Sequence, residues 1–142
     1  MDGSESSLKA YQYTSFLAKQ CDAALLIVNI FDTFERFERT SKKIMQELEE
    51  FAKQKEAEGG TAVTLQILDD YKSQAKDSGI KDVKTVRREG NAAAEILLIA
   101  DEEKVDTIVI GSKGINTVKE FLVGSVSHKI VHHAKCPVTV VR

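Results

Sequence analysis

The stretch TIVIGSKGINTVKEFLVGSVS, residues 107–127, decides the fold. Its first four residues are apolar or β-branched, which is typical of a buried strand. Gly111 and Gly114 then bracket a short loop, and Gly124 and Ser125 open the next helix. A strand, a glycine loop and a helix start in this order can hold an anion on the backbone N–H groups at the helix N-terminus.

Strand and helix patterns alternate along the rest of the chain. We expect strands at 23–30, 83–88, 107–110 and 138–141, and helices up to about 20, at 92–103 and at 125–134, with two more between 34 and 78 that a Gly59-Gly60 break separates. Gly79 is expected to end a helix and Asn91 to cap the next. This alternation predicts an α/β fold with an open parallel sheet and right-handed crossovers.

Two helices have a recognisable buried face. In the first, the stripe consists of Ala10, Thr14, Leu17 and Cys21, and Phe16 falls well off it. In the last, we expect the inner face to consist of Val126, Ile130, Val131 and Ala134.

The bulk properties describe an ordinary globular protein. A chain of 142 residues predicts one domain, 1–142, which is long enough to bury a core without disulfides. Twenty basic residues against 22 acidic ones leave no basic surplus, so nucleic acid is not an expected partner. We find no membrane-spanning run and no signal peptide, and Cys21 and Cys136 lack metal spacing. A reduced, cytoplasmic setting is expected.

The glycine loop has two interpretations from spacing alone. In the first, Gly111 and Gly114, which can adopt positive φ, let a phosphate approach the backbone closely, the Ser125 and Ser127 hydroxyls can add hydrogen bonds, and Lys113 can neutralise charge. In the second, two glycine turns merely connect elements. The loop has neither the Walker spacing nor the GxGxxG pattern.

The spacing G-2x-G-9x-G-S over residues 111–125 resembles the G-2x-G-9x-G-[S/T] signature of the ATP-binding branch of the universal stress protein family. The segments VGSVS (123–127) and AKCPVTVVR (134–142) resemble the closing part of that UspA-like family. DGSESSLKA (2–10) resembles its first-strand exit and first helix, so the resemblance covers nearly the whole chain.

The resemblance implies a five-stranded, Rossmann-like parallel sheet of the adenine-nucleotide alpha-hydrolase type, in order 3-2-1-4-5, with helices on both faces. It implies ATP or AMP, with Mg or Mn, at the point where the strand order reverses. The phosphates and ribose would be held by Gly111, Gly114, Gly124, Ser125 and Val126. Ile110 would line their approach, Asp2 would lie by the adenine, and Ile30 would reach it through its backbone.

The chain departs from the family pattern in two places. Family members have an apolar strand directly before the equivalent of Asp2, whereas this sequence starts at Met1, so the first, central strand is absent from this chain. Three explanations stand: a misassigned start or a fragment, which we favour; direct pairing of the two flanking strands; or a strand from a partner chain. The second departure is a helical insertion at 34–60, either a solvated helix or a lid or dimer arm.

Three functions are weighed on this basis. The leading one is an adenine-nucleotide-binding stress-response regulator that forms a homodimer through its last strand, 138–141, which is an open apolar edge. The alternative is a dimeric protein-interaction module that binds no nucleotide. An ATPase or phosphotransferase comes third, and any hydrolysis is expected to be slow because no general base is visible beside the loop.

The remaining chemically active side chains have simpler interpretations. His128 and His132 stand four apart, as metal ligands can, but no third ligand is evident, and we expect an exposed pair. His133 is expected to be structural. Both cysteines are expected to pack as small apolar residues.

Overall fold

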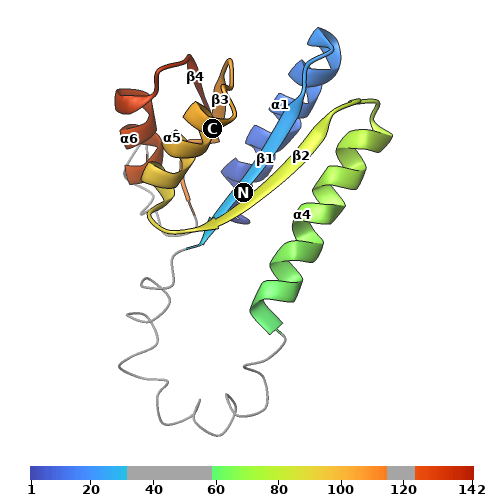
Figure 1. Cartoon of the computed structure of the whole chain (residues 1–142), viewed down its shortest axis with the longest axis horizontal. Coiled ribbons are helices and arrows are strands. Elements are labelled where there is room, and N and C mark those ends of the chain that lie inside the picture. The colour runs from blue at the N-terminus through green and yellow to red at the C-terminus, as the bar shows by residue number, and fades with distance from the viewer. Residues whose placement is uncertain (32–58, 115–123) are drawn as a thin grey trace, which may run out of the picture.

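The computed structural model describes residues 1–31, 59–114 and 124–142 (Figure 1). Helices and strands alternate through these residues: α1 (Glu5–Cys21), β1 (Leu25–Phe31), α4 (Gly59–Asp77), β2 (Val83–Glu89), α5 (Ala92–Glu102), β3 (Ile108–Gly111), α6 (Ser125–His133) and β4 (Val138–Val141). This order confirms the predicted α/β fold. The expected helical insertion up to residue 58 lies outside the described residues, and α4 begins at Gly59, so the expected break at Gly59-Gly60 stays a prediction.

Local sequence signals set the ends of three helices. The Ser4 side chain accepts a hydrogen bond from the Ser7 N–H at 3.2 Å and caps α1, and Asn91 caps α5 in the same way. Gly79 follows α4 with φ of +100° and donates its N–H to the Lys76 carbonyl at 2.9 Å. The predicted caps at Asn91 and Gly79 are therefore confirmed.

The four strands form two separate parallel pairs. Leu25 of β1 lies opposite Val83 of β2, and Ile108 of β3 lies opposite Val138 of β4. Within the described residues β1 and β3 share no ladder, so the alternative in which these two strands close up and pair is wrong. The pairs agree with the expected order 3-2-1-4-5 if the central position between β1 and β3 is left open.

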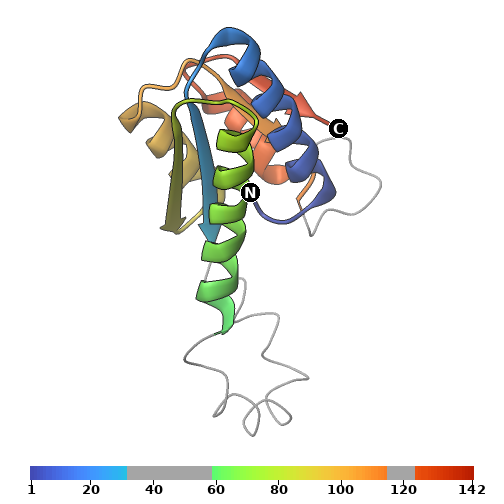
Figure 2. The ribbon, with the colours of Figure 1, turned by 90° about the vertical axis from the view of Figure 1, so that its right-hand side faces the viewer.

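Helices lie on both sides of the strands (Figure 2), and the buried apolar residues form two clusters. The first cluster joins α1 and α4 to β1 and β2, with Leu68 3% exposed and Ala75 fully buried, and α1 also packs against β3 and β4. The Tyr11 hydroxyl joins these helices by donating to the Tyr71 carbonyl at 2.8 Å. The second cluster joins α5 and α6 to β3 and β4 around a fully buried Ile130, and α5 also packs against β1. These clusters confirm that helices cover both faces.

Two surface positions test the predicted helix faces. Phe16 is 60% exposed, as its place off the α1 stripe predicted. Val131 is 52% exposed, so its assignment to the inner face of α6 is wrong. Successive residues of a helix are rotated by about 100°, and the burial of Ile130 turns its neighbour outward. None of the described helices combines the length and the apolar character that crossing a membrane requires.

Candidate functional site

The glycine loop begins as a continuation of the second sheet. After β3, the Ser112 N–H donates to the Val141 carbonyl at 2.7 Å, and Ser112 is only 4% exposed. The Ser112 carbonyl in turn accepts from the Gly124 N–H at 2.6 Å and from the Ser127 hydroxyl at 3.1 Å. Ser112 thus joins the end of β3 directly to the beginning of α6.

The first turn of α6 presents backbone donors. Gly124 is the N-cap residue and supplies no side chain to satisfy them, so the first N–H groups of the helix have no intrahelical partner. Ser125 is exposed and Val126 is half-buried at this end. The helix dipole adds partial positive charge, and the turn is therefore suited to an anion.

Ser127 does not contribute its hydroxyl to that end, as the sequence had suggested. It is 2% exposed, and its hydroxyl contacts the Gly124 carbonyl at 3.0 Å as well as that of Ser112. These bonds hold the loop against the helix. The expected ligand role of Ser127 is wrong because its place in the helix turns it inward.

The start of α1 packs against the other side of the loop. The Ser6 hydroxyl donates to the Lys113 carbonyl, and the Lys113 N–H approaches the Ser6 Oγ at 3.3 Å. Sequence reasoning did not foresee this role of Ser6. Its only sequence signal is its place in a serine cluster that also contains the true cap, Ser4.

The loop glycines serve close approach and not unusual backbone angles. The described glycines with positive φ are Gly3, Gly79 and Gly90, so Gly111 and Gly114 do not use the positive φ that glycine can adopt. A Cβ on Gly111 would lie 2.6 Å from the Ser6 carbonyl carbon, and one on Gly114 would lie 3.0 Å from the Asp2 carboxylate. The chain's own α1 therefore makes the close approach to Gly111.

Asp2 lies beside Gly114 and is held by the turn that follows it. Its Oδ1 accepts from the Ser4 N–H at 3.0 Å and from the Ser4 hydroxyl at 2.7 Å. Partial desolvation alone would raise the pKa of Asp2, but hydrogen bonds from Ser4 and Ser7 and the nearby amino group of Met1 outweigh it and lower that pKa. Asp2 is thus an ionised, oriented carboxylate at the rim of the site.

The lowered pKa of Asp2 predicts a pH-dependent contribution to stability. The ionised form stabilises the fold above the ordinary value of 3.8, and this contribution is lost as the pH falls through the lower folded-state pKa. Asp2→Asn should reduce the free energy of unfolding at pH 7 by about 0.5 kcal/mol, since the group is exposed. Urea unfolding at pH 7, 5, 4 and 3 should show this difference shrinking below pH 4. A difference that stays constant down to pH 3 contradicts the assignment.

One cavity brings the expected site residues together. It has a volume of about 1200 Å³ and runs between β1 and β3. The nine residues singled out from the sequence all line it: Asp2, Ile30, Ile110, Gly111, Lys113, Gly114, Gly124, Ser125 and Val126. The loop, Asp2 and the α6 N-terminus lie at the end where both strands finish.

Ile30 enters this cavity through its main chain. The Leu25 N–H donates to the Asp82 carbonyl just before β2, and the Phe31 carbonyl accepts from the Gly90 N–H just after it. Odd-numbered residues of β1 therefore direct their backbone groups toward β2. Alternation along the strand then directs those of Ile30 toward the cavity. This placement agrees with a backbone role for Ile30.

The other chemically active side chains do not join the site. His128, His132 and His133 are all exposed, so the expected structural role of His133 is wrong. The rings of His128 and His132 lie 4.7 Å apart, and the described residues contain no group of three metal-ligating side chains. Cys136 packs in the apolar cluster of α5 and α6, as expected, whereas Cys21 is exposed, so its expected burial is wrong.

Comparison with known proteins gives the family. A family model described as the universal stress protein family matches residues 1–142. The chain belongs to the universal stress protein family. It is 36% identical over 146 residues to a universal stress protein of Staphylococcus aureus strain N315, an alignment that covers 100% of this chain and 80% of that protein.

Solved universal stress proteins share the fold. UspA from Lactobacillus plantarum aligns with a TM-score of 0.77 at 23% identity, covering 100% of this chain and 93% of the other. A universal stress protein in complex with cAMP aligns with a TM-score of 0.69 at 25% identity, covering 100% and 91%. A universal stress protein from Archaeoglobus fulgidus in complex with dAMP aligns with a TM-score of 0.62 at 17% identity, covering 100% of this chain and 92% of the other. At this identity the likeness shows a shared fold only.

Proposed function

We propose that this universal stress protein binds an adenine nucleotide, ATP or AMP, and acts as a cytoplasmic, homodimeric stress-response regulator. The observation that carries the proposal is the joining of the glycine loop to the α6 N-terminus through Ser112, in a cavity that Asp2 also lines. A family member with a solved structure binds cAMP, which is an adenine nucleotide.

The phosphates would lie between the loop and the helix. Gly114 and the first N–H groups of α6, at Ser125 and Val126, offer backbone approach without a side chain in between. Gly124 keeps the entry to that turn open, and the Lys113 side chain would balance part of the charge. Gly111 acts indirectly in this arrangement, because it lets α1 pack close behind the loop.

The adenine and ribose would extend from the loop toward β1. Ile110 would contact the ribose, the Ile30 backbone would bond the base, and Asp2 would accept a hydrogen bond from ribose or adenine. A bound Mg or Mn ion would depend mainly on phosphate oxygens, since the described residues offer no cluster of three side-chain ligands. The arrangement favours binding over turnover.

Dimerisation would use β4. Its one described ladder partner is β3, so its other edge is available to the same strand of a second copy. Its residues are all half-buried in the single chain, as expected for an apolar edge that pairs further.

The binding proposal predicts a thermal shift that one glycine controls. Saturating MgATP or MgAMP at about 100 times Kd stabilises a folded protein by about 2.7 kcal/mol, which raises Tm by roughly 5–10 °C in a domain of this size. Gly114→Val should abolish the shift, because the new side chain fills the phosphate approach beside Asp2. Differential scanning fluorimetry measures the thermal shift of the unchanged protein and of Gly114→Val.

A matched control and an overturning result complete this test. Ala94→Val adds similar bulk at an exposed position on α5, outside the cavity, and should keep the full shift. Heat-denatured protein should also release nucleotide that chromatography detects. The absence of released nucleotide together with no shift from either ligand overturns the proposal, and an unchanged shift in Gly114→Val excludes the loop as the site.

A further inference from the structure

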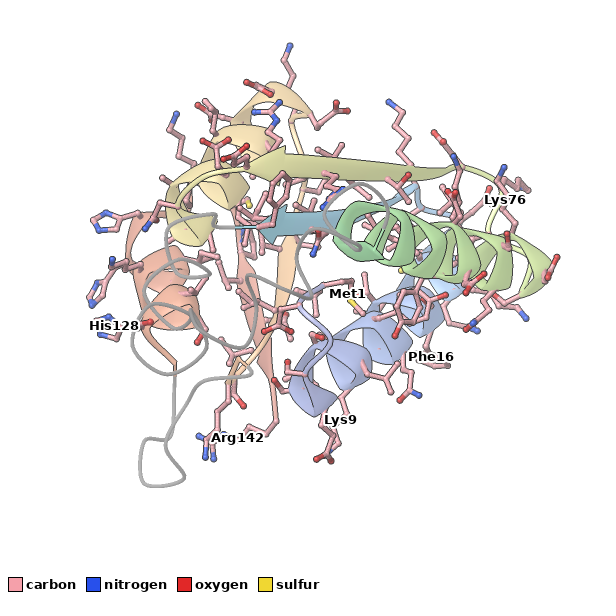
Figure 3. All side chains as sticks on the ribbon, turned by 90° about the horizontal axis from the view of Figure 1, so that it is seen from below. Met1, Lys9, Phe16, Lys76, His128 and Arg142 are labelled. Atoms are coloured by element: carbon pink, nitrogen blue, oxygen red, sulfur yellow. The ribbon has the colours of Figure 1, made fainter. Side chains whose placement is uncertain are left out.

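The outer side of α6 carries two imidazole rings on neighbouring turns. His128 and His132 are four residues apart, which places their side chains one above the other on the same face of the helix. Their ring centroids lie 4.7 Å apart, with the ring planes at 70°. Figure 3 shows His128 on the side of α6 that faces away from the rest of the molecule. Neither residue lines the cavity of the candidate nucleotide site.

The distance between the two rings fits a single metal ion held by both. A ring nitrogen lies about 2.1 Å from a bound Zn²⁺, so two imidazoles on one tetrahedral ion have ring centroids roughly 5 Å apart. The observed 4.7 Å agrees with this value. The hydrogen-bonded turns of α6 fix the spacing of the two Cα atoms, so only the rings would have to rotate to turn a nitrogen toward the ion.

Both rings are accessible to a ligand. His128 and His132 are exposed, and no hydrogen bond or ion pair joins either ring to another of the described residues. The third histidine, His133, does not extend the pair. Its ring centroid lies 6.4 Å from that of His132, and adjacent residues of a helix point about 100° apart. The geometry therefore selects two histidines out of three.

The charges around the pair are compatible with a bound cation. His132 belongs to the last turn of α6, where the negative end of the helix dipole attracts positive charge. Lys135, which follows the helix, is paired with the Asp101 carboxylate at 2.6 Å, so its charge is partly neutralised. Lys129 lines the cavity, on another side of the helix from the pair.

Imidazole ligands select one class of ion. Their nitrogens suit Zn²⁺, Ni²⁺ and Cu²⁺, whereas Mg²⁺ and Ca²⁺ prefer oxygen ligands. The described residues contain no group of three metal-ligating side chains, so water would fill the other coordination positions. A site of this kind therefore differs in its chemistry from the phosphate oxygens that would hold Mg or Mn beside a nucleotide.

We propose that His128 and His132 chelate one divalent transition-metal ion, Zn²⁺ or Ni²⁺, on the outer face of α6. Each histidine contributes one ring nitrogen, and the ion joins two turns of the helix. The unfolded chain does not hold the two rings together, so the ion should also stabilise the folded protein. The site lies outside the cavity, and the proposal does not depend on nucleotide binding.

The histidine ring signals in NMR spectra test which residues bind. The chain contains three histidines, so a long-range proton–nitrogen spectrum of the full chain has three sets of ring signals, which single substitutions assign. Added Zn²⁺ should change the signals of His128 and His132 together, with the same midpoint. The signals of His133 should stay where they are. A response of all three rings, or of one ring alone, overturns the proposal.

Calorimetric titration with Ni²⁺ tests the chelate quantitatively. In a buffer with millimolar Mg²⁺, the protein should bind one Ni²⁺ ion per chain. His128→Ala and His132→Ala should each weaken binding at least about tenfold, because one imidazole alone lacks the high effective concentration of its neighbour. The double variant should be little weaker than either single variant. Ni²⁺ should raise the Tm of the unchanged protein and leave that of the double variant unchanged.

Two matched variants serve as controls. His133→Ala removes the remaining histidine, and Cys21→Ser removes the exposed thiol, which is the other side chain able to bind such an ion. Both should keep the full affinity for Ni²⁺. All of these substitutions alter exposed side chains, so the variants should fold.

Four results would overturn the chelate. Unchanged binding in the double variant places the ion elsewhere. Single variants that bind with unchanged affinity show two independent imidazoles. Half an ion per chain, with association that sedimentation detects only in the presence of metal, shows that two copies share the ion. The absence of saturable binding below millimolar Ni²⁺ shows an exposed ring pair without a metal site.

Discussion

Gly111→Ala is expected to lower the free energy of unfolding by about 3 kcal/mol, at the upper end of the usual range for overpacking. The reason is steric. A Cβ at this position would lie 2.6 Å from the carbonyl carbon and 2.8 Å from the carbonyl oxygen of Ser6, which belong to the first turn of α1. A backbone cannot rotate away as a side chain does, so the whole helix start would have to move.

Urea unfolding followed by circular dichroism measures this loss. Because the Ser6 hydroxyl bonds the backbone of Lys113, moving α1 should also release the loop and weaken any nucleotide binding. Gly111→Ala should therefore affect stability and ligand binding together.

Gly114→Ala is the matched control for this prediction. Its Cβ would meet the end of the flexible Asp2 side chain at 3.0 Å, which can shift at low cost. We expect less than about 1 kcal/mol of destabilisation, close to the roughly 0.5 kcal/mol of ordinary surface substitutions. Equal losses in the two alanine variants would contradict the close packing of α1 on Gly111.

Ile130→Ala is expected to cost about 3 kcal/mol, within the 2–5 kcal/mol that such truncations cost in protein cores. Ile130 is fully buried in the cluster that joins α5 and α6 to β3, next to Ala93 and Ile108. Removing its outer carbons leaves a cavity that the surrounding helices can fill only in part. The midpoint of urea unfolding should fall, with little change in the slope.

The neighbouring residue offers the control. Val131→Ala alters the next side chain of α6, which is 52% exposed, and should change stability by less than about 0.5 kcal/mol. A loss at Val131 as large as that at Ile130 would show that the inner face of α6 is misassigned.

Local signals explain why the elements were predictable. Apolar runs, the Asn91 cap and the Gly79 terminator act within a few residues, and each was confirmed. The helix faces were less predictable. A stripe with Val126, Ile130 and Ala134 can rotate slightly in either direction, and packing against α5 decided that Val131 faces outward.

The candidate site, too, was predictable only in part. Spacing singled out Gly111, Gly114 and Gly124, and these line one cavity. Ser6 was missed because its partner, Lys113, is distant in sequence, whereas Ser127 was misjudged because its hydroxyl turns inward to the Ser112 and Gly124 carbonyls. No periodicity reports a hydrogen bond between residues more than 100 positions apart.

The sequence by itself determined the alternation of strands and helices, the loop spacing and the family, because these depend on neighbouring residues and short repeats. Only the tertiary structure decided that Gly111 serves close packing of α1 and that Ser112 joins β3 to α6. These features depend on which distant backbones meet. That is fixed by the pairing of strands and the packing of helices over them, and no single segment of the sequence encodes it.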